Sequence, residues 1–146
     1  PDPSPEKRLT HQAALEDAYI VVIDDEGDSR ELIANILEPA GAEVVVAADV
    51  AAGRRAIFAR APDLIISDLG MPYADGFELL RQLRMMGEPY ANTPVIALTA
   101  YARDEDRERA LNAGFFAHVG KPFDVETLLA AAAEAVVTAR GRCLRG

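Results

Sequence analysis

The sequence predicts a single α/β domain in which five parallel strands alternate with five helices. Short apolar runs rich in β-branched residues alternate along the chain with segments of helical periodicity. Three of these runs lack the polar–apolar alternation of a half-exposed strand, as is typical of strands covered on both faces of a parallel sheet. A length of 146 residues suits one domain. Alternating elements joined by right-handed crossovers give an open, doubly wound (βα)₅ sheet.

The predicted strands are short runs of apolar residues. They are Tyr19–Ile23, Glu43–Val46, Asp63–Ile66, Pro94–Leu98 and Phe115–Val119. The first, third and fourth have no alternation, so we expect them to be buried on both faces.

The predicted helices have recognisable beginnings or ends. Aspartates that can accept hydrogen bonds from a first turn open four of them: Asp28, Asp49, Asp75 and Asp124. The fourth helix in chain order is expected from about Arg103 to Ala113, with its end at Gly114. The helix opened by Asp124 is expected to run from Val125 to about Thr138.

The two ends of the chain differ from its body in composition. Residues 1–17 are predicted to be a linker, because three of the first five residues are prolines, and a short helical turn is expected near Thr10–Glu16. Residues 18–138 form the predicted domain, and residues 139–146 a frayed C-terminal tail. The single cysteine, Cys143, has no partner in the chain. A lone cysteine suits a reducing compartment, so we expect a cytoplasmic protein.

The charge and hydropathy of the chain argue against two kinds of partner. A formal net charge of −9 opposes direct binding to nucleic acid or to an anionic membrane surface. No apolar run approaches the roughly 20 residues that span a bilayer. The polar, proline-rich beginning is unlike a secretory signal. We therefore expect neither nucleic-acid binding nor membrane insertion.

Reactive side chains follow four of the five predicted strands. Asp24 and Asp25 follow the first, Asp68 the third, Thr99 the fourth and Lys121 the fifth. Ligands of open α/β sheets bind at the carboxyl ends of the strands, so these side chains are expected to converge. Each alone could be a turn residue, a cap or a solvated charge. Together, the carboxylates would repel one another unless Lys121 and a divalent cation compensated them, and oxygen ligands favour Mg²⁺.

A metal-held carboxylate beside an ammonium and a hydroxyl is suited to phosphoryl transfer. Asp68 is the predicted nucleophile, because it stands alone after the central strand and precedes a turn that begins at Gly70. The cation and Lys121 would neutralise the equatorial oxygens of the transition state.

Five motifs then identify a family resemblance. They are Asp24-Asp25-Glu26, Ser67-Asp68-Leu69-Gly70-Met71-Pro72, Asp75-Gly76, Thr99-Ala100 and Lys121-Pro122-Phe123. In this order and spacing, over about Tyr19 to Val137, they resemble the response-regulator receiver family of two-component signalling. The body of the chain is also similar to receivers attached to hybrid histidine kinases. The resemblance implies a flavodoxin-like strand order 2-1-3-4-5.

The resemblance also implies roles for the site residues. Asp25, Asp68 and the Gly70 carbonyl would ligate Mg²⁺, with Asp24 acting through water. Thr99 and Lys121 would hold the phosphoryl oxygens on Asp68, and the Lys121–Pro122 peptide would be cis. The donor would be a phosphohistidine of a histidine kinase or of a histidine phosphotransfer protein. The chain would be a signalling receiver rather than an enzyme.

Three positions depart from the usual family pattern. Gly70 stands two residues after Asp68, where a side chain is usual, and Tyr101 stands two residues after Thr99, where a polar residue is common. His118 occupies the position of the usual switch aromatic, three residues before the lysine. It is either a smaller, titratable switch or a partly exposed strand residue.

Three other functions were weighed against phosphoacceptance. An aspartyl-nucleophile, Mg²⁺-dependent phosphatase would need a second Asp where Gly70 stands. A flavin-binding module would need a Gly/Ser/Thr-rich first loop, whereas this one is acidic. A non-phosphorylated, receiver-like interaction module would be expected to have lost some of the site residues, all of which are present.

Overall fold

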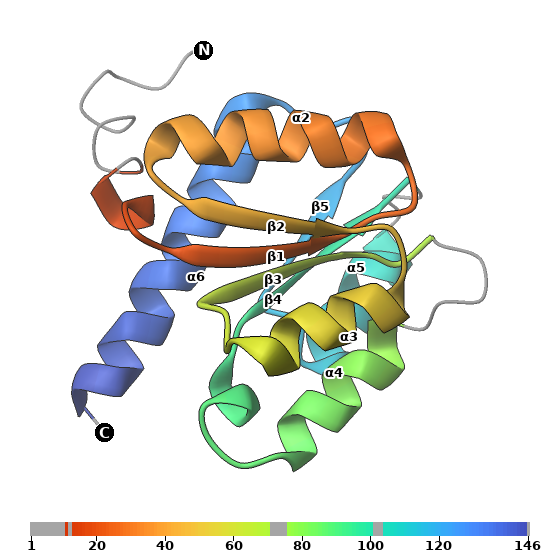
Figure 1. The fold of residues 1–146 in the computed structure, drawn as a ribbon. Coiled ribbons are helices and arrows are strands. Elements are labelled where there is room, and N and C mark those ends of the chain that lie inside the picture. The colour runs from red at the N-terminus through yellow and green to blue at the C-terminus, as the bar shows by residue number, and fades with distance from the viewer. Residues whose placement is uncertain (1–10, 12, 71–75, 101–103, 146) are drawn as a thin grey trace.

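A five-stranded parallel sheet forms the centre of the molecule (Figure 1). The computed structural model describes residues 11, 13–70, 76–100 and 104–145. The strand order is β2-β1-β3-β4-β5, as the sequence predicted. The strands are β1 (Tyr19–Ile23), β2 (Glu43–Ala47), β3 (Leu64–Asp68), β4 (Val95–Thr99) and β5 (Ala117–Gly120). The helices are α2 (Gly27–Leu37), α3 (Val50–Ala59), α4 (Gly76–Met85), α5 (Asp104–Ala113) and α6 (Val125–Arg145), with 3₁₀ turns η1 (Glu38–Ala40) and η2 (Tyr90–Asn92).

Helices cover both faces of the sheet (Figure 1). On one face, α2 and α6 pack against strand residues such as Val22 and Ile66. On the other, α3, α4 and α5 pack against their neighbours Val21 and Ile65. Successive side chains of a strand point to opposite faces, so each central strand contributes to both cores. Every residue of β1, β3 and β4 is buried, which confirms the prediction made from their lack of alternation.

Two of the predicted helix caps are present and one is not. The Asp49 carboxylate accepts a hydrogen bond from Ala52 N at 2.7 Å, and the Asp124 carboxylate accepts one from Thr127 N at 2.7 Å. The prediction for Asp28 is wrong, because α2 already begins at Gly27 and Asp28 lies within its first turn. The predicted cap Asp75 and the predicted start at Arg103 lie outside the described residues.

The last helix is longer than the sequence indicated. Instead of ending near Thr138, α6 continues to Arg145, so residues 139–145 are helical rather than a frayed tail. Arg140 anchors this extension, because its guanidinium donates to the carbonyls of Ala14 (3.2 Å) and Glu16 (3.3 Å). Within the described part of the chain, no helix is both long and apolar enough to cross a membrane.

The end of the predicted linker is part of the folded body. Residues 13–15 are helical, and the Leu15 side chain is fully buried in the core beneath α2 and α6. Asp17 N donates to the carbonyl of Gly41 at 3.0 Å, and Glu43 N donates to the carbonyl of Ala18 at 2.8 Å. The segment therefore packs beside β2 before the chain enters β1. For residues 1–10 and 12, which lie outside the described part, the linker remains a prediction.

Candidate functional site at the carboxyl ends of the strands

Parallel pairing brings four of the predicted site residues to one edge of the sheet. Asp24 directly follows β1, and Asp68 and Thr99 are the last residues of β3 and β4. Lys121 directly follows β5, and its N–H donates to the carbonyl of Thr99 at 2.8 Å. Backbone hydrogen bonds therefore continue to the carboxyl ends of the strands. They fix the backbone positions from which the side chains of the site extend.

The Lys121 ammonium contacts three carboxylates. Its Nζ lies 2.8 Å from Asp24 Oδ2, 3.0 Å from Asp68 Oδ2 and 3.4 Å from Glu26 Oε1. An ammonium has three N–H donors, so these contacts can engage all of them. The Lys121–Pro122 peptide is cis, as the family resemblance implied.

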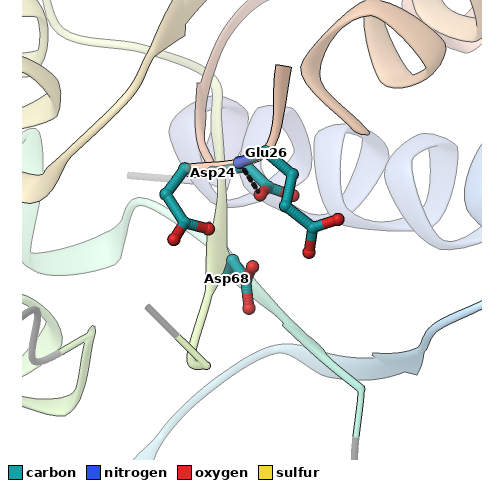
Figure 2. A group of neighbouring side chains, drawn as sticks. Asp24, Glu26 and Asp68 are labelled. Carbon is teal, nitrogen blue, oxygen red and sulfur yellow. Dashed lines mark hydrogen bonds between the residues drawn. The ribbon is translucent and has the colours of Figure 1, made fainter. Parts of the chain in front are cut away.

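Backbone donors hold the second oxygen of both buried carboxylates. Glu26 N donates to Asp24 Oδ1 at 2.9 Å, and Gly70 N donates to Asp68 Oδ1 at 2.8 Å. The carboxyl groups of Asp24, Glu26 and Asp68 gather in one small region above the strand ends (Figure 2). Asp24 and Asp68 are thus each fixed between a backbone N–H and Lys121.

Burial and neighbouring charges change the proton affinity of Asp24 and Lys121. Asp24 is fully buried and Asp68 is 5% exposed. Burial raises the pKa of the Asp24 carboxyl, and the charge of Asp68 acts in the same direction. Hydrogen bonds from Lys121 and Glu26 N oppose the rise without cancelling it. For Lys121, burial alone would lower the pKa, but hydrogen bonds and charges from Asp24 and Asp68 raise it, so the amine stays protonated.

The donor set fits a hard divalent cation. Oxygens of Asp24, Asp25, Glu26 and Asp68 all lie within 4.8 Å of one another. Four carboxylates face the single ammonium of Lys121, and a divalent cation would compensate most of the remaining negative charge. Carboxylate oxygens favour Mg²⁺ over softer metals. Receiver domains generally bind Mg²⁺ at such an acidic cluster.

Two predicted residues stand at the margin of the cluster. Gly70 is exposed, and a Cβ added to it would lie 3.3 Å from Asp68 Oδ1, so glycine avoids a close contact with that carboxylate. His118 pairs with Ala97 on β4, two residues before the strand end at Thr99, and therefore lies below the cluster rather than in it. Tyr101 lies outside the described residues.

His118 is half-buried on β5. Its Nε2 is buried and has no hydrogen-bond partner in the described part of the chain. Burial lowers the pKa of the imidazole; the positive charge of Arg107 acts in the same direction and the carboxylate of Asp106 opposes both.

Sequence reasoning gave no role to three residues that shape the site. Glu26 was read only as part of a motif, although it contacts Lys121. Arg30 Nη1 donates to the Asp24 carbonyl at 2.8 Å, a contact that sequence spacing does not specify. A Cβ at Gly53 would lie 2.4 Å from Ile23 Cδ1. Glycine therefore allows α3 to approach β1 immediately before Asp24.

Comparison with known proteins agrees with this geometry. A family model described as the response regulator receiver domain matches residues 20–133. An uncharacterized 14.6 kDa protein of Leptolyngbya boryana is 44% identical over 106 residues, which are 72% of this chain and 79% of that protein. The DNA-binding dual master transcriptional regulator RpaA of Synechocystis is 38% identical over 111 residues, which are 76% of this chain but only 46% of the regulator.

A solved structure shows the same architecture. The chemotaxis response regulator CheY4 of Vibrio cholerae superimposes with a TM-score of 0.75 and 32% identity, over 82% of this chain and 98% of that one. The fold and the matched sequence agree. The chain therefore belongs to the response regulator receiver family and is a phosphoacceptor domain of two-component signalling.

Proposed function

We propose that Asp68 is the residue that accepts the phosphoryl group. The observation that carries this proposal is its position: a buried carboxylate at the end of a central strand, with Oδ2 on the Lys121 ammonium and Oδ1 on Gly70 N. Asp24 is held in the same way, by Glu26 N and Lys121, but it is fully buried, whereas Asp68 is 5% exposed and is followed two residues later by the exposed Gly70. Asp68 is thus the carboxylate that an incoming phosphoryl group can approach.

Each site residue has its own role in the proposed phosphoryl transfer. An oxygen of Asp68 attacks phosphorus, the bond from phosphorus to the donor nitrogen breaks, and its electron pair stays on the departing imidazole. Lys121 moves from the carboxylate to a phosphoryl oxygen, and the Thr99 hydroxyl binds another. Asp25, Asp68 and the Gly70 carbonyl would hold Mg²⁺ directly and Asp24 through water. When bound, the ion neutralises charge on the phosphoryl oxygens.

The donor in this proposal is the phosphohistidine of a histidine kinase or of a histidine phosphotransfer protein. Receiver domains interact with proteins of these two kinds. The chain is then a stoichiometric signalling receiver in the cytoplasm, which assists only the phosphorylation and dephosphorylation of its own Asp68. The chain spans about half the length of several curated relatives, so the response that follows phosphorylation belongs to the whole protein.

The test is labelling of Asp68→Asn with radiolabelled acetyl phosphate and Mg²⁺. The substitution is nearly isosteric, so we expect a folded protein that takes up no label. Asp63→Asn is the matched control, because Asp63 is a partly buried aspartate beside the other end of β3, and it should be labelled like the unmodified chain. Label that persists on Asp68→Asn would show that another residue accepts the phosphoryl group. Repeated turnover of a phosphomonoester, instead of a single label, would favour a phosphatase.

A further inference from the structure

Glu26 is an additional acid at the site. Its side chain is 65% exposed, and Oε1 lies 3.4 Å from Lys121 Nζ. This is the longest of the three contacts of the ammonium, since Asp24 Oδ2 lies at 2.8 Å and Asp68 Oδ2 at 3.0 Å. A carboxylate oxygen of Glu26 also lies within 4.8 Å of one from each of Asp24, Asp25 and Asp68. Glu26 is therefore close enough to change the electrostatic potential at the site.

The local structure does not require the Glu26 carboxylate. Asp24 and Asp68 each have one oxygen on a backbone N–H and the other on Lys121. Glu26 supplies one of these N–H groups, which any residue except proline could provide. Although Glu26 is the N-cap residue of α2, its side chain makes no capping hydrogen bond within the described part of the chain. What the side chain adds is a negative charge and a long contact with Lys121.

That charge acts in opposite directions on the two ligands of the site. A carboxylate attracts a divalent cation bound among Asp24, Asp25 and Asp68, and it repels the anionic oxygens of a phosphodonor. Glu26 also engages the ammonium that has to turn toward the phosphoryl group. Because Glu26 is exposed, salt reduces both effects without changing their signs.

We propose that Glu26 is a specificity-determining residue that strengthens divalent-cation binding and weakens phosphorylation by small anionic donors. This inference rests on the proposed role of Asp68 as the phosphoacceptor. A residue with a purely structural role would weaken both processes when it is replaced. Glu26 is expected to change them in opposite directions.

The experiment compares the unmodified chain with Glu26→Gln, Glu26→Asp and Asp28→Asn. Asp28→Asn removes an equal charge from the exposed first turn of α2, outside the acidic cluster, and is the matched control. Calorimetric titration with Mg²⁺ gives the dissociation constant without any phosphoryl transfer. Labelling by acetyl phosphate at saturating Mg²⁺ gives the phosphorylation rate.

For Glu26→Gln we expect the Mg²⁺ dissociation constant to rise about three- to tenfold and the labelling rate to rise about threefold. Glu26→Asp keeps the charge and should stay within about twofold of the unmodified chain in both measurements, as should Asp28→Asn. An unchanged Mg²⁺ affinity in Glu26→Gln, or a fall in both affinity and rate, would overturn the inference. Either result would leave Asp68 as the phosphoacceptor if the unmodified chain is still labelled there. Label on another residue would instead contradict the proposed role of Asp68 as the phosphoacceptor.

Discussion

The two ends of the sheet use carboxylates in different ways. At the amino end, Asp63 Oδ2 accepts a hydrogen bond from Tyr19 N at 2.8 Å. At the carboxyl end, oxygens of Asp24, Asp25, Glu26 and Asp68 lie within 4.8 Å of one another, and the Lys121 ammonium contacts Asp24, Glu26 and Asp68. The Asp63 carboxylate satisfies a backbone donor at the start of a strand, as folding requires.

At the carboxyl end, Asp24 and Asp68 also accept backbone hydrogen bonds, but satisfying these two donors does not require four carboxylates in one cluster. Repulsion from Asp68 contributes to the raised pKa of the Asp24 carboxyl, and burial contributes more. Charges placed where they raise one another's energy indicate a ligand that compensates them. The comparison therefore separates a carboxylate that stabilises the fold from carboxylates to which we assign phosphoryl transfer.

The largest effect is expected for Lys121→Gln. This change removes the ammonium that contacts Asp24 and Asp68 and, in our account, binds a phosphoryl oxygen. Loss of one such donor should slow phosphorylation by acetyl phosphate about 100-fold at saturating Mg²⁺. Arg60→Gln is the control, because it removes a cation that pairs with Glu43 at the outer strand β2 and should leave the rate unchanged. A Lys121→Gln rate close to that of the unmodified chain would mean that the lysine serves only to pair the carboxylates.

At the amino end, Asp63→Ala should reduce stability rather than phosphorylation. The Tyr19 N–H would lose its acceptor, which should lower the free energy of unfolding by about 1–2 kcal/mol. In Mg²⁺-free buffer, Asp68→Asn should change the free energy of unfolding by less than about 0.5 kcal/mol. The loss of repulsion between Asp68 and Asp24 offsets the weaker bond to Lys121. Urea unfolding of both variants measures the difference. If Asp68→Asn lost as much stability as Asp63→Ala, the two ends of the sheet would not differ as described.

A smaller effect is expected at Gly70. A Cβ there would lie 3.3 Å from Asp68 Oδ1, so a longer side chain would stand beside the Asp68 carboxylate. Glycine offers no group to orient an attacking water, so the phosphorylated chain should keep its label for longer than seconds in Mg²⁺. Gly70→Asn should speed loss of label about fivefold, whereas Gly70→Ala, which adds no polar group, should not. Slower loss from Gly70→Asn would contradict this account.

The smallest effect concerns the imidazole of His118. Its pKa should lie below that of an unstructured histidine, because burial disfavours the charged form and Arg107 adds to this effect while Asp106 opposes it. The unfolded chain then binds the proton more readily than the folded chain. The contribution of His118 to stability is therefore present above the unfolded pKa of about 6.5 and is lost as the pH falls from there through the lower folded pKa.

NMR titration with and without beryllofluoride measures the His118 pKa in the two states. If His118 turns inward as a switch, its pKa should fall further with beryllofluoride, because the ring becomes less solvated. An unchanged pKa and an unmoved ring would place the switch elsewhere.

The sequence allowed the sheet to be predicted more completely than the ends of its helices. Unbroken apolar runs predicted β1, β3 and β4, which the structure buries throughout. The end of α6 could not be predicted in the same way, because Arg140 reaches carbonyls more than a hundred residues earlier in the chain. At the start of α2, Glu26 is the N-cap residue and Asp28 lies in the first turn. The start of a helix is uncertain by one or two residues when it is inferred from local sequence.

For the site, the order of strands was sufficient to predict which residues meet. Asp24, Asp68 and Lys121 are contributed by β1, β3 and β5, and the structure brings them within hydrogen-bond distance. Glu26 and Arg30 were missed because their contacts depend on how the side chains fold back from α2. The backbone path predicts where a side chain begins, but not which neighbour it contacts.

The most direct test of the central claim is to map the phosphorylated residue in the unmodified chain. The chain would be incubated with acetyl phosphate and Mg²⁺, the acyl phosphate trapped by borohydride reduction, and the peptides sequenced by mass spectrometry. Our account predicts a single reduced residue at position 68 and none at Asp24, Asp25 or Glu26. Reduction at one of those three acids, with Asp68 unmodified, would contradict it.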